Sequence, residues 1–226
     1  MPSPNKKSVL KRINRTGIVP EFYHDDPEVC KNVLTVCYEA GIRVVEYLDN
    51  APRIQENYIF LKKYVQKNLP DLYLGIGNVK EEEMAQKAID FNADFLVGSI
   101  INPEVGDLCK KKNILWIPGC ATPTEINQAR KAGASLIKIF PAEALGVSFV
   151  RSVKKIFPDL QFMPSGGVYP NATGIIPWME AGVAAVNMGH NLISDEMLAL
   201  NDFSYLQVHL KKLLKTVRQW RRQSIV

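Results

Sequence analysis

The chain has 226 residues, a hydrophobic share of 46%, a charged share of 23% and a formal net charge of +5. This composition is typical of a globular protein and excludes a disordered or fibrous chain. The length can bury a sizeable core, so we expect residues 1–226 to form a single domain. No apolar stretch is long enough for a signal peptide or a membrane span, which predicts a cytoplasmic protein. The four cysteines form no Cys-x-x-Cys pair and no cluster with histidine, so we expect reduced thiols and no metal site.

Eight short β-rich segments recur along the chain, each followed by an amphipathic segment of helix length. They are GIVPEF (17–22), IRVVEYL (42–48), LYLGIG (72–77), DFLVG (94–98), ILWIPG (114–119), LIKIFP (136–141), QFMPSGG (161–167) and AAVNMGH (184–190). Strands that alternate with helices indicate a parallel sheet covered by helices. Eight such units predict a (β/α)₈ TIM barrel, here with an extra N-terminal helix, and functional residues at the carboxyl ends of the strands. An open doubly wound sheet is the alternative, but it predicts a GxGxxG turn that the first strand lacks.

The last segment, LKKLLKTVRQWRRQ at 210–223, is basic and carries no acid. Its apolar residues recur at helical spacing: Leu210, Leu213, Leu214, Val217 and Trp220. We expect a final helix that docks by this face and leaves its basic residues in water. A patch that binds nucleic acid or a membrane surface is the alternative.

Lys138 stands in the middle of the apolar segment SLIKIFPAE. Because side chains alternate along a strand, Lys138 and Phe140 share one face, whereas Ile137 and Ile139 share the other. If the isoleucines pack against outer helices, Lys138 points into the barrel. Burial disfavours an ammonium, so we expect a depressed pKa and a nucleophilic amine able to form a Schiff base with a carbonyl substrate. A structural lysine paired with a buried acid is the alternative.

Glu46 lies in the second strand candidate, RVVEYL, where the same alternation places it on the face opposite to Arg43. Arg43 is therefore not its partner. A carboxylate that faces an inward lysine can move protons on and off a carbinolamine and an enamine. A simple salt bridge between Lys138 and Glu46 is the alternative, and both interpretations can hold together.

Glycine-containing turns follow the last two strand candidates, in PSGGVYPN and NMGHNL. Backbone N–H groups at such turns bind phosphate, and barrels often hold a phosphate between these two loops. Glycine also suits a tight turn without any ligand. The position of both turns after the last two strands favours phosphate.

These segments resemble, in order, the class I 2-keto-3-deoxy-6-phosphogluconate (KDPG) and 4-hydroxy-2-oxoglutarate aldolases. The resemblance runs from about Gly17 to Ile193, and its most specific parts are KIFPAE and the downstream SGG. It implies a homotrimer of (β/α)₈ barrels that cleaves a small keto-acid phosphate to pyruvate and an aldehyde. It implies no metal, no organic cofactor, and no nucleic-acid or membrane partner.

The resemblance also assigns roles to residues of this chain. Lys138 is similar to the Schiff-base lysine and Glu46 to the general acid/base. Phe140 and Pro141, in the signature, fall beside the substrate. The phosphate-binding turns take in Ser165, Gly166, Gly167, Gly189 and His190.

The chain departs from the family pattern where the family holds the pyruvate carboxylate. Asn50 stands in place of an arginine, and Arg53 is the nearest replacement. Asn78 stands in place of a hydroxyl residue, Ser99 in place of a proline, and His190 in place of a serine. An amide does not read carboxylate geometry as a guanidinium does, so the exact substrate stays open.

Two other functions therefore remain open. An isomerase or epimerase of sugar phosphates would use the same barrel without a trappable covalent intermediate. A binding protein for sugar phosphates or keto acids would not catalyse at all, and Asn50, Asn78 and Ser99 would then mark a decayed site.

Overall fold

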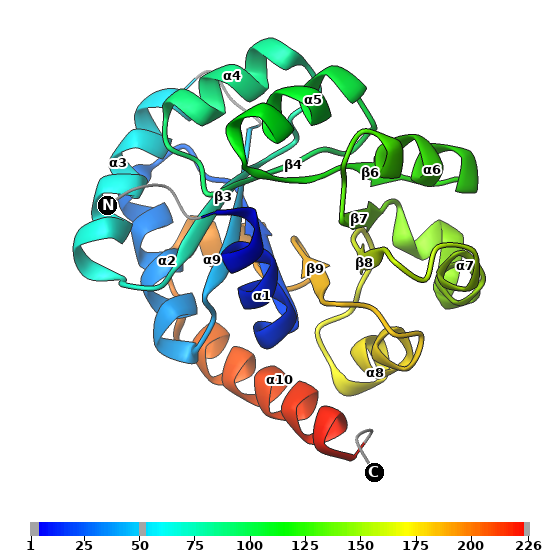
Figure 1. The fold of residues 1–226 in the computed structure, drawn as a ribbon. Coiled ribbons are helices and arrows are strands. Elements are labelled where there is room, and N and C mark those ends of the chain that lie inside the picture. The colour runs from blue at the N-terminus through cyan, green and yellow to red at the C-terminus, as the bar shows by residue number, and fades with distance from the viewer. Residues whose placement is uncertain (1–4, 50–52, 224–226) are drawn as a thin grey trace.

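The computed structural model describes residues 5–49 and 53–223. All eight predicted strand segments form β-strands, and the fifth forms two (Figure 1). The strands are β1 Ile18–Phe22, β2 Val44–Leu48, β3 Tyr73–Gly77, β4 Phe95–Val97, β5 Leu115–Ile117, β6 Gly119–Cys120, β7 Leu136–Ile139, β8 Gln161–Pro164 and β9 Val186–Met188. The predicted order of strands along the chain is therefore confirmed.

Helices alternate with the strands and surround them (Figure 1). They are α1 Lys6–Thr16, α2 Pro27–Ala40, α3 Ile54–Asn68, α4 Glu82–Asp90, α5 Pro103–Lys112, α6 Pro123–Lys131, α7 Ala142–Ile156, α8 Ala172–Glu180, α9 Asp195–Leu200 and α10 Ser204–Gln223. The side chains of Asp26, Thr122 and Asn171 cap the first turns of α2, α6 and α8. Gly41 ends α2 at φ 107°, a left-handed conformation that glycine adopts without strain.

The strands are parallel and form a curled sheet, so the predicted α/β fold is confirmed. Their hydrogen-bond ladders divide into two sheets, in the orders β5-β4-β3-β2-β1-β9 and β6-β7-β8, in place of one closed ring. The first division falls at Pro118, which has no N–H and separates β5 from β6. At the second, a backbone hydrogen bond from Ala184 N to Phe162 O joins β8 to the segment before β9.

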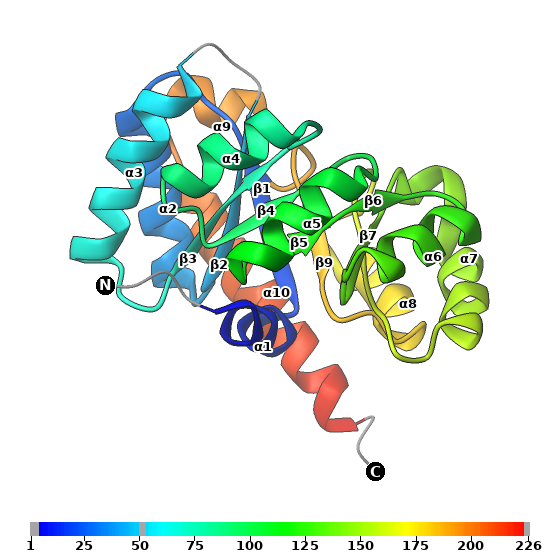
Figure 2. The same cartoon turned by 45° about the horizontal axis from the view of Figure 1, so that its top comes forward.

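Inward-facing side chains form a core of their own, closed at one end by α1. Val9 and Ile13 of this helix are fully buried against Val19, Val44 and inward residues of the other strands. Figure 2 shows α1 lying across the ends at which β2 and β5 begin. The predicted extra N-terminal helix is confirmed, and it leaves the opposite, carboxyl ends of the strands for function.

The C-terminal helix α10 docks by its apolar face, as predicted. Leu210, Leu213, Leu214 and Val217 are buried, and Trp220 is partly buried. Figures 1 and 2 show α10 running beside α2, with its last turns extending beyond the rest of the fold. Of the helices in residues 5–49 and 53–223, none is long and apolar enough to cross a membrane.

Replacing Ile13 with alanine should lower the free energy of unfolding by about 2–5 kcal/mol, because it leaves a cavity in the inner core. Urea denaturation would measure the change. Lys11→Ala, on the exposed side of the same helix, is the control and should change the free energy by less than about 0.5 kcal/mol. Equal effects of the two substitutions would contradict the role of α1 as a plug.

Candidate active site

Lys138 projects from β7 into the interior, where two carboxylates meet it. Ile137 and Ile139 point the other way and pack in the core formed with the surrounding helices, so the predicted alternation along this strand is confirmed. The side chain is 5% exposed. Its Nζ lies 3.1 Å from Oε2 of Glu21 and 3.5 Å from Oε1 of Glu46.

Glu21, on β1, is the site residue that the sequence analysis missed. It pairs in register with Glu46 on the neighbouring β2, so the two carboxylates approach Lys138 from adjacent strands. The signal that could have found it is the alternation already applied to Lys138 and Glu46. In GIVPEF that rule turns Val19 and Glu21 inward, and Val19 does belong to the inner core.

Glu46 is fully buried, and Asn187 of β9 holds it. The Nδ2 of Asn187 donates to Glu46 Oε2 at 3.1 Å and to the backbone oxygen of Val19 at 3.1 Å. Gly77 on β3 makes room on the other side, because a Cβ there would lie 2.1 Å from Glu46 Oε1. Glu46 Oε1 and Asn187 Oδ1 are buried without a hydrogen-bond partner among the described residues.

The surroundings of Glu46 shift its pKa in both directions. Burial raises the pKa of its carboxyl group, Lys138 lowers it, and the charge of Glu21 raises it again, for a pKa of about 7. Near neutral pH, Glu46 therefore exchanges a proton readily, which is the property that a general acid/base needs.

The predicted depression of the Lys138 pKa is wrong. Burial alone would lower the pKa of this amine, but the carboxylates of Glu46 and Glu21 outweigh burial and raise it above its ordinary value. The prediction considered burial alone, whereas two carboxylates lie beside the amine. Lys138 rests as an ammonium and must give up a proton before its nitrogen can attack a carbonyl carbon.

Asn78 and Ser99, predicted on different strands, lie together. Ser99 Oγ donates to Asn78 Oδ1 at 3.0 Å, and Asn78 Nδ2 donates to the backbone oxygen of Asp49 at 3.2 Å. Arg53 is exposed next to α3, and its side chain makes no ion pair with a described residue. Asn50 lies outside the described residues.

The two predicted glycine turns border one cavity of about 330 Å³. Asn191 Nδ2 donates to Val168 O at 3.5 Å and thereby joins the turns. The lining includes Gly166, Gly167, Gly189 and His190. Glu21 lines the same cavity, so the cavity adjoins Lys138. Within the described chain, Gly166 and Gly167 donate no backbone hydrogen bond.

The remaining predicted residues lie around Lys138. Ser165 is fully buried, and its Oγ lies 3.5 Å from Glu21 Oε1, so it touches the carboxylate pair. The ring of Phe140 is centred 5.6 Å from Lys138 Nζ. Pro141 is exposed at the start of α7. Exposed His190 has its Nδ1 3.6 Å from Oδ1 of Asp195.

A buried lysine beside two carboxylates, at the end of a cavity, is able to form and break a Schiff base. The amine supplies the nucleophile once it is deprotonated, and the carboxylates accept and return protons. The fold and this arrangement define a Schiff-base enzyme on a parallel α/β scaffold.

A model of the KDPG and KHG aldolase family matches residues 9–208, and the chain belongs to this family. The 2-dehydro-3-deoxy-phosphogluconate aldolase of Treponema pallidum is 29% identical over 93% of this chain and 98% of its own. The 2-dehydro-3-deoxy-6-phosphogalactonate aldolase of Escherichia coli is 30% identical over 68% of this chain and 73% of its own. The sequence-based prediction of an aldolase, a carbon–carbon lyase, is thereby confirmed.

Solved structures agree on the fold. The KDPG aldolase of Legionella pneumophila, with pyruvate captured at low pH as a covalent carbinolamine intermediate, superposes with a TM-score of 0.82. The match covers 90% of this chain and 97% of that one, at 20% sequence identity. The curled parallel sheet is therefore the scaffold of this aldolase family.

Glu21→Gln should lower the pKa of Glu46 below about 7, because it removes a neighbouring negative charge that disfavours ionisation. Carbon-13 NMR of protein labelled at the glutamate carboxyl carbon would follow the titration. Glu104→Gln, exposed on α5, is the control and should leave the midpoint of Glu46 in place. An unchanged midpoint in Glu21→Gln would contradict the coupling of the two carboxylates.

Proposed function

We propose that this aldolase cleaves a 2-keto-3-deoxy sugar acid phosphate of the KDPG type, or 4-hydroxy-2-oxoglutarate, to pyruvate and an aldehyde through a Schiff base on Lys138. The aldehyde is glyceraldehyde 3-phosphate or glyoxylate. The observation that carries the proposal is the placement of Lys138 Nζ 3.1 Å from Glu21 and 3.5 Å from Glu46 in a nearly closed interior.

The first half of the reaction builds the Schiff base. Glu46 takes a proton from the Lys138 ammonium, and the rise of its pKa to about 7 makes this uphill transfer easier than it would be to an ordinary carboxylate. The neutral amine attacks the 2-keto carbon and forms a carbinolamine. Glu46 then returns the proton to the hydroxyl group, which leaves as water, and a cationic iminium remains that the carboxylates stabilise.

The second half breaks the C3–C4 bond. Loss of the proton from the C4 hydroxyl group lets the bonding electrons move into the iminium, which yields the aldehyde and an enamine. Glu21 lines the cavity and is partly exposed, so we assign it the C4 hydroxyl proton. The proton that Glu21 took passes through water to Glu46, which protonates the enamine carbon. Hydrolysis of the resulting iminium then releases pyruvate and frees Lys138.

The substrate carboxylate needs polar partners away from the two glutamates. Asn78 and Ser99 lie together at the ends of neighbouring strands, which supports their assignment to this group. Arg53 is exposed next to α3, and we assign it to this group from the family resemblance. We assign Asn50 to the same group from the sequence alone. Phe140 and Pro141 would border the reacting carbons.

We assign the distal phosphate to the turns after β8 and β9. The unengaged N–H groups of Gly166 and Gly167 support this assignment, together with Ser165, Gly189 and His190. Glu143, at the start of α7, works against it, because its carboxylate lines the same cavity and repels a phosphate.

The further assignments rest on the family. We propose that residues 1–226 form one domain in which the two sheets close into a (β/α)₈ barrel. We also propose a homotrimer, a cytoplasmic location and catalysis without a cofactor. An isomerase or epimerase of sugar phosphates and a non-catalytic binding barrel are the competing functions, and neither would trap pyruvate covalently.

Incubation with pyruvate and borohydride should add one reduced pyruvate to Lys138, because borohydride reduces the iminium to a stable amine. Peptide mass spectrometry would locate the adduct. Lys138→Met should give no adduct, and Glu46→Gln should slow trapping by about 10²-fold or more, because it removes the proton acceptor. A wild-type protein that never forms the adduct would overturn the proposed function.

Glu143→Gln should lower the KM for a phosphorylated substrate several-fold, because it removes a negative charge from the phosphate cavity. Steady-state kinetics with KDPG and with 4-hydroxy-2-oxoglutarate would measure the effect. The KM for 4-hydroxy-2-oxoglutarate, which has no phosphate, should change little. Equal changes for both substrates would contradict the assignment of this cavity to phosphate.

A further inference from the structure

A second cavity lies at the opposite end of the fold from Lys138. It has a volume of about 510 Å³ and is bordered by α1, by α10 and by the segments that lead into β2 and β3. Arg43 lies directly before β2, and Asp71 lies shortly before β3, so the cavity is at the end of the sheet where the strands begin. Parallel strands begin at one edge and end at the other, so this cavity is separate from the turns around Lys138.

Four arginines and a single aspartate line this cavity. They are Arg12, Arg15, Arg43, Arg218 and Asp71. The aspartate compensates little of this charge, because its side chain is 72% exposed and lies 3.8 Å from Arg12. Arg15, Arg43 and Arg218 form no ion pair with a carboxylate of residues 5–49 or 53–223. Like charges around one cavity repel one another, and an anion within it would relieve that repulsion.

Two of the four guanidinium groups are held in place. Arg43 donates through Nη1 to the backbone oxygens of Tyr38 and Ile42, each at 2.7 Å, and lies 3.9 Å from the centre of the Tyr38 ring. Arg12 lies 5.8 Å from the centre of the Tyr73 ring. Because these contacts already order both side chains, a ligand that binds them loses less conformational entropy in doing so.

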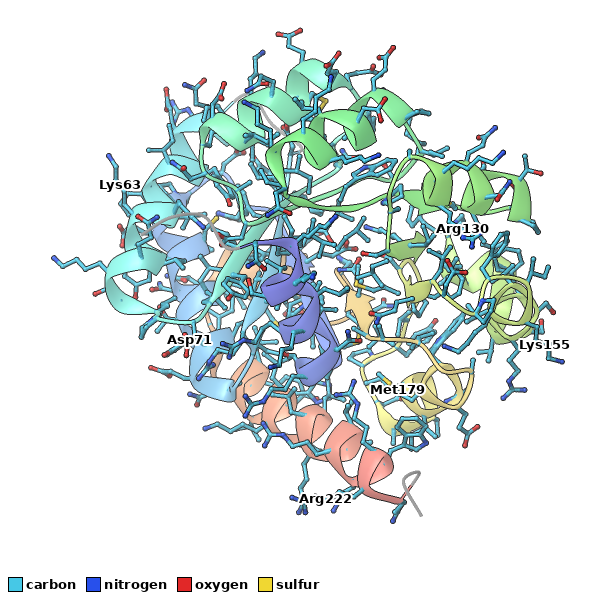
Figure 3. All side chains as sticks on the ribbon, in the orientation of Figure 1. Lys63, Asp71, Arg130, Lys155, Met179 and Arg222 are labelled. Carbon is cyan, nitrogen blue, oxygen red and sulfur yellow. The ribbon has the colours of Figure 1, made fainter. Side chains whose placement is uncertain are left out.

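Helix α10 supplies the fourth arginine from the far end of the chain. The apolar face of α10 fixes the helix against α2, and Arg218 follows directly after buried Val217. Two basic residues of this helix therefore lie in different surroundings. Arg218 faces the cavity, whereas Arg222 is exposed near the outer end of the helix, away from Asp71 (Figure 3).

We propose that this cavity is a second binding site, for a small organic molecule that carries two or more phosphate groups. Guanidinium forks bind phosphate oxygens in pairs, and the excess of arginine over aspartate favours a ligand with several negative charges. The volume exceeds the need of a single phosphate and lies within the range of small-molecule sites. The proposal does not depend on the chemistry at Lys138.

Titration calorimetry with inorganic triphosphate, at physiological ionic strength, tests the site on the full chain. The wild type should bind one triphosphate at this cavity. Arg15→Gln and Arg218→Gln should each weaken binding about tenfold, because each removes a charged donor pair. Both side chains are exposed, so the variants should fold, and thermal unfolding without ligand would verify this.

Arg222→Gln is the matched control, with the same change of charge on the same helix outside the cavity. It should alter the affinity by less than about twofold. Lys138→Met should bind triphosphate as the wild type does, and the cavity variants should still trap pyruvate. Absence of triphosphate binding, an equal loss in Arg222→Gln, or full affinity in both cavity variants would each overturn the proposal.

Discussion

The burial of one ammonium between two carboxylates is the interaction on which the site depends. An isolated charge in the interior would be costly, and so would the pair of glutamates without Lys138. Together the three groups compensate one another, with Nζ 3.1 Å from Glu21 and 3.5 Å from Glu46. Burial raises the pKa of Glu46, Lys138 lowers it and the charge of Glu21 raises it again, for a pKa of about 7.

The surrounding fold serves this arrangement in specific ways. Pairing of β1 with β2 and with β9 brings Glu21, Glu46 and Asn187 to neighbouring positions. Gly77 leaves space that any side chain would take from Glu46. At the other end, α1 closes the interior, and the cavity that Glu21 lines lies at the turns that follow the strands. The positions of the acid and base groups therefore follow from the order of the strands in the sheet and from the alternation of side chains along each strand.

Much of this could be predicted from the sequence, because the relevant signals are local. The β-rich segments and the alternation that turns Lys138 and Glu46 inward both follow from residue type and spacing. What escaped prediction depends on neighbours that are distant in the chain. The hydrogen bond from Asn187 to Glu46 needs β9 beside β1, and the direction of the Lys138 pKa needs Glu21 to be counted. The separation of the strands into two sheets likewise depends on pairing across the fold.

The protonation state of Lys138 in the resting enzyme tests the central claim most directly. Nitrogen-15 NMR of protein labelled at the lysine Nζ atoms, with Lys138→Met to assign the signal, would report it across pH. The account predicts an ammonium at pH 7 that loses its proton only above the pH at which an ordinary lysine does, because two carboxylates stabilise it. A neutral amine at pH 7 would contradict the account, since burial would then outweigh both glutamates.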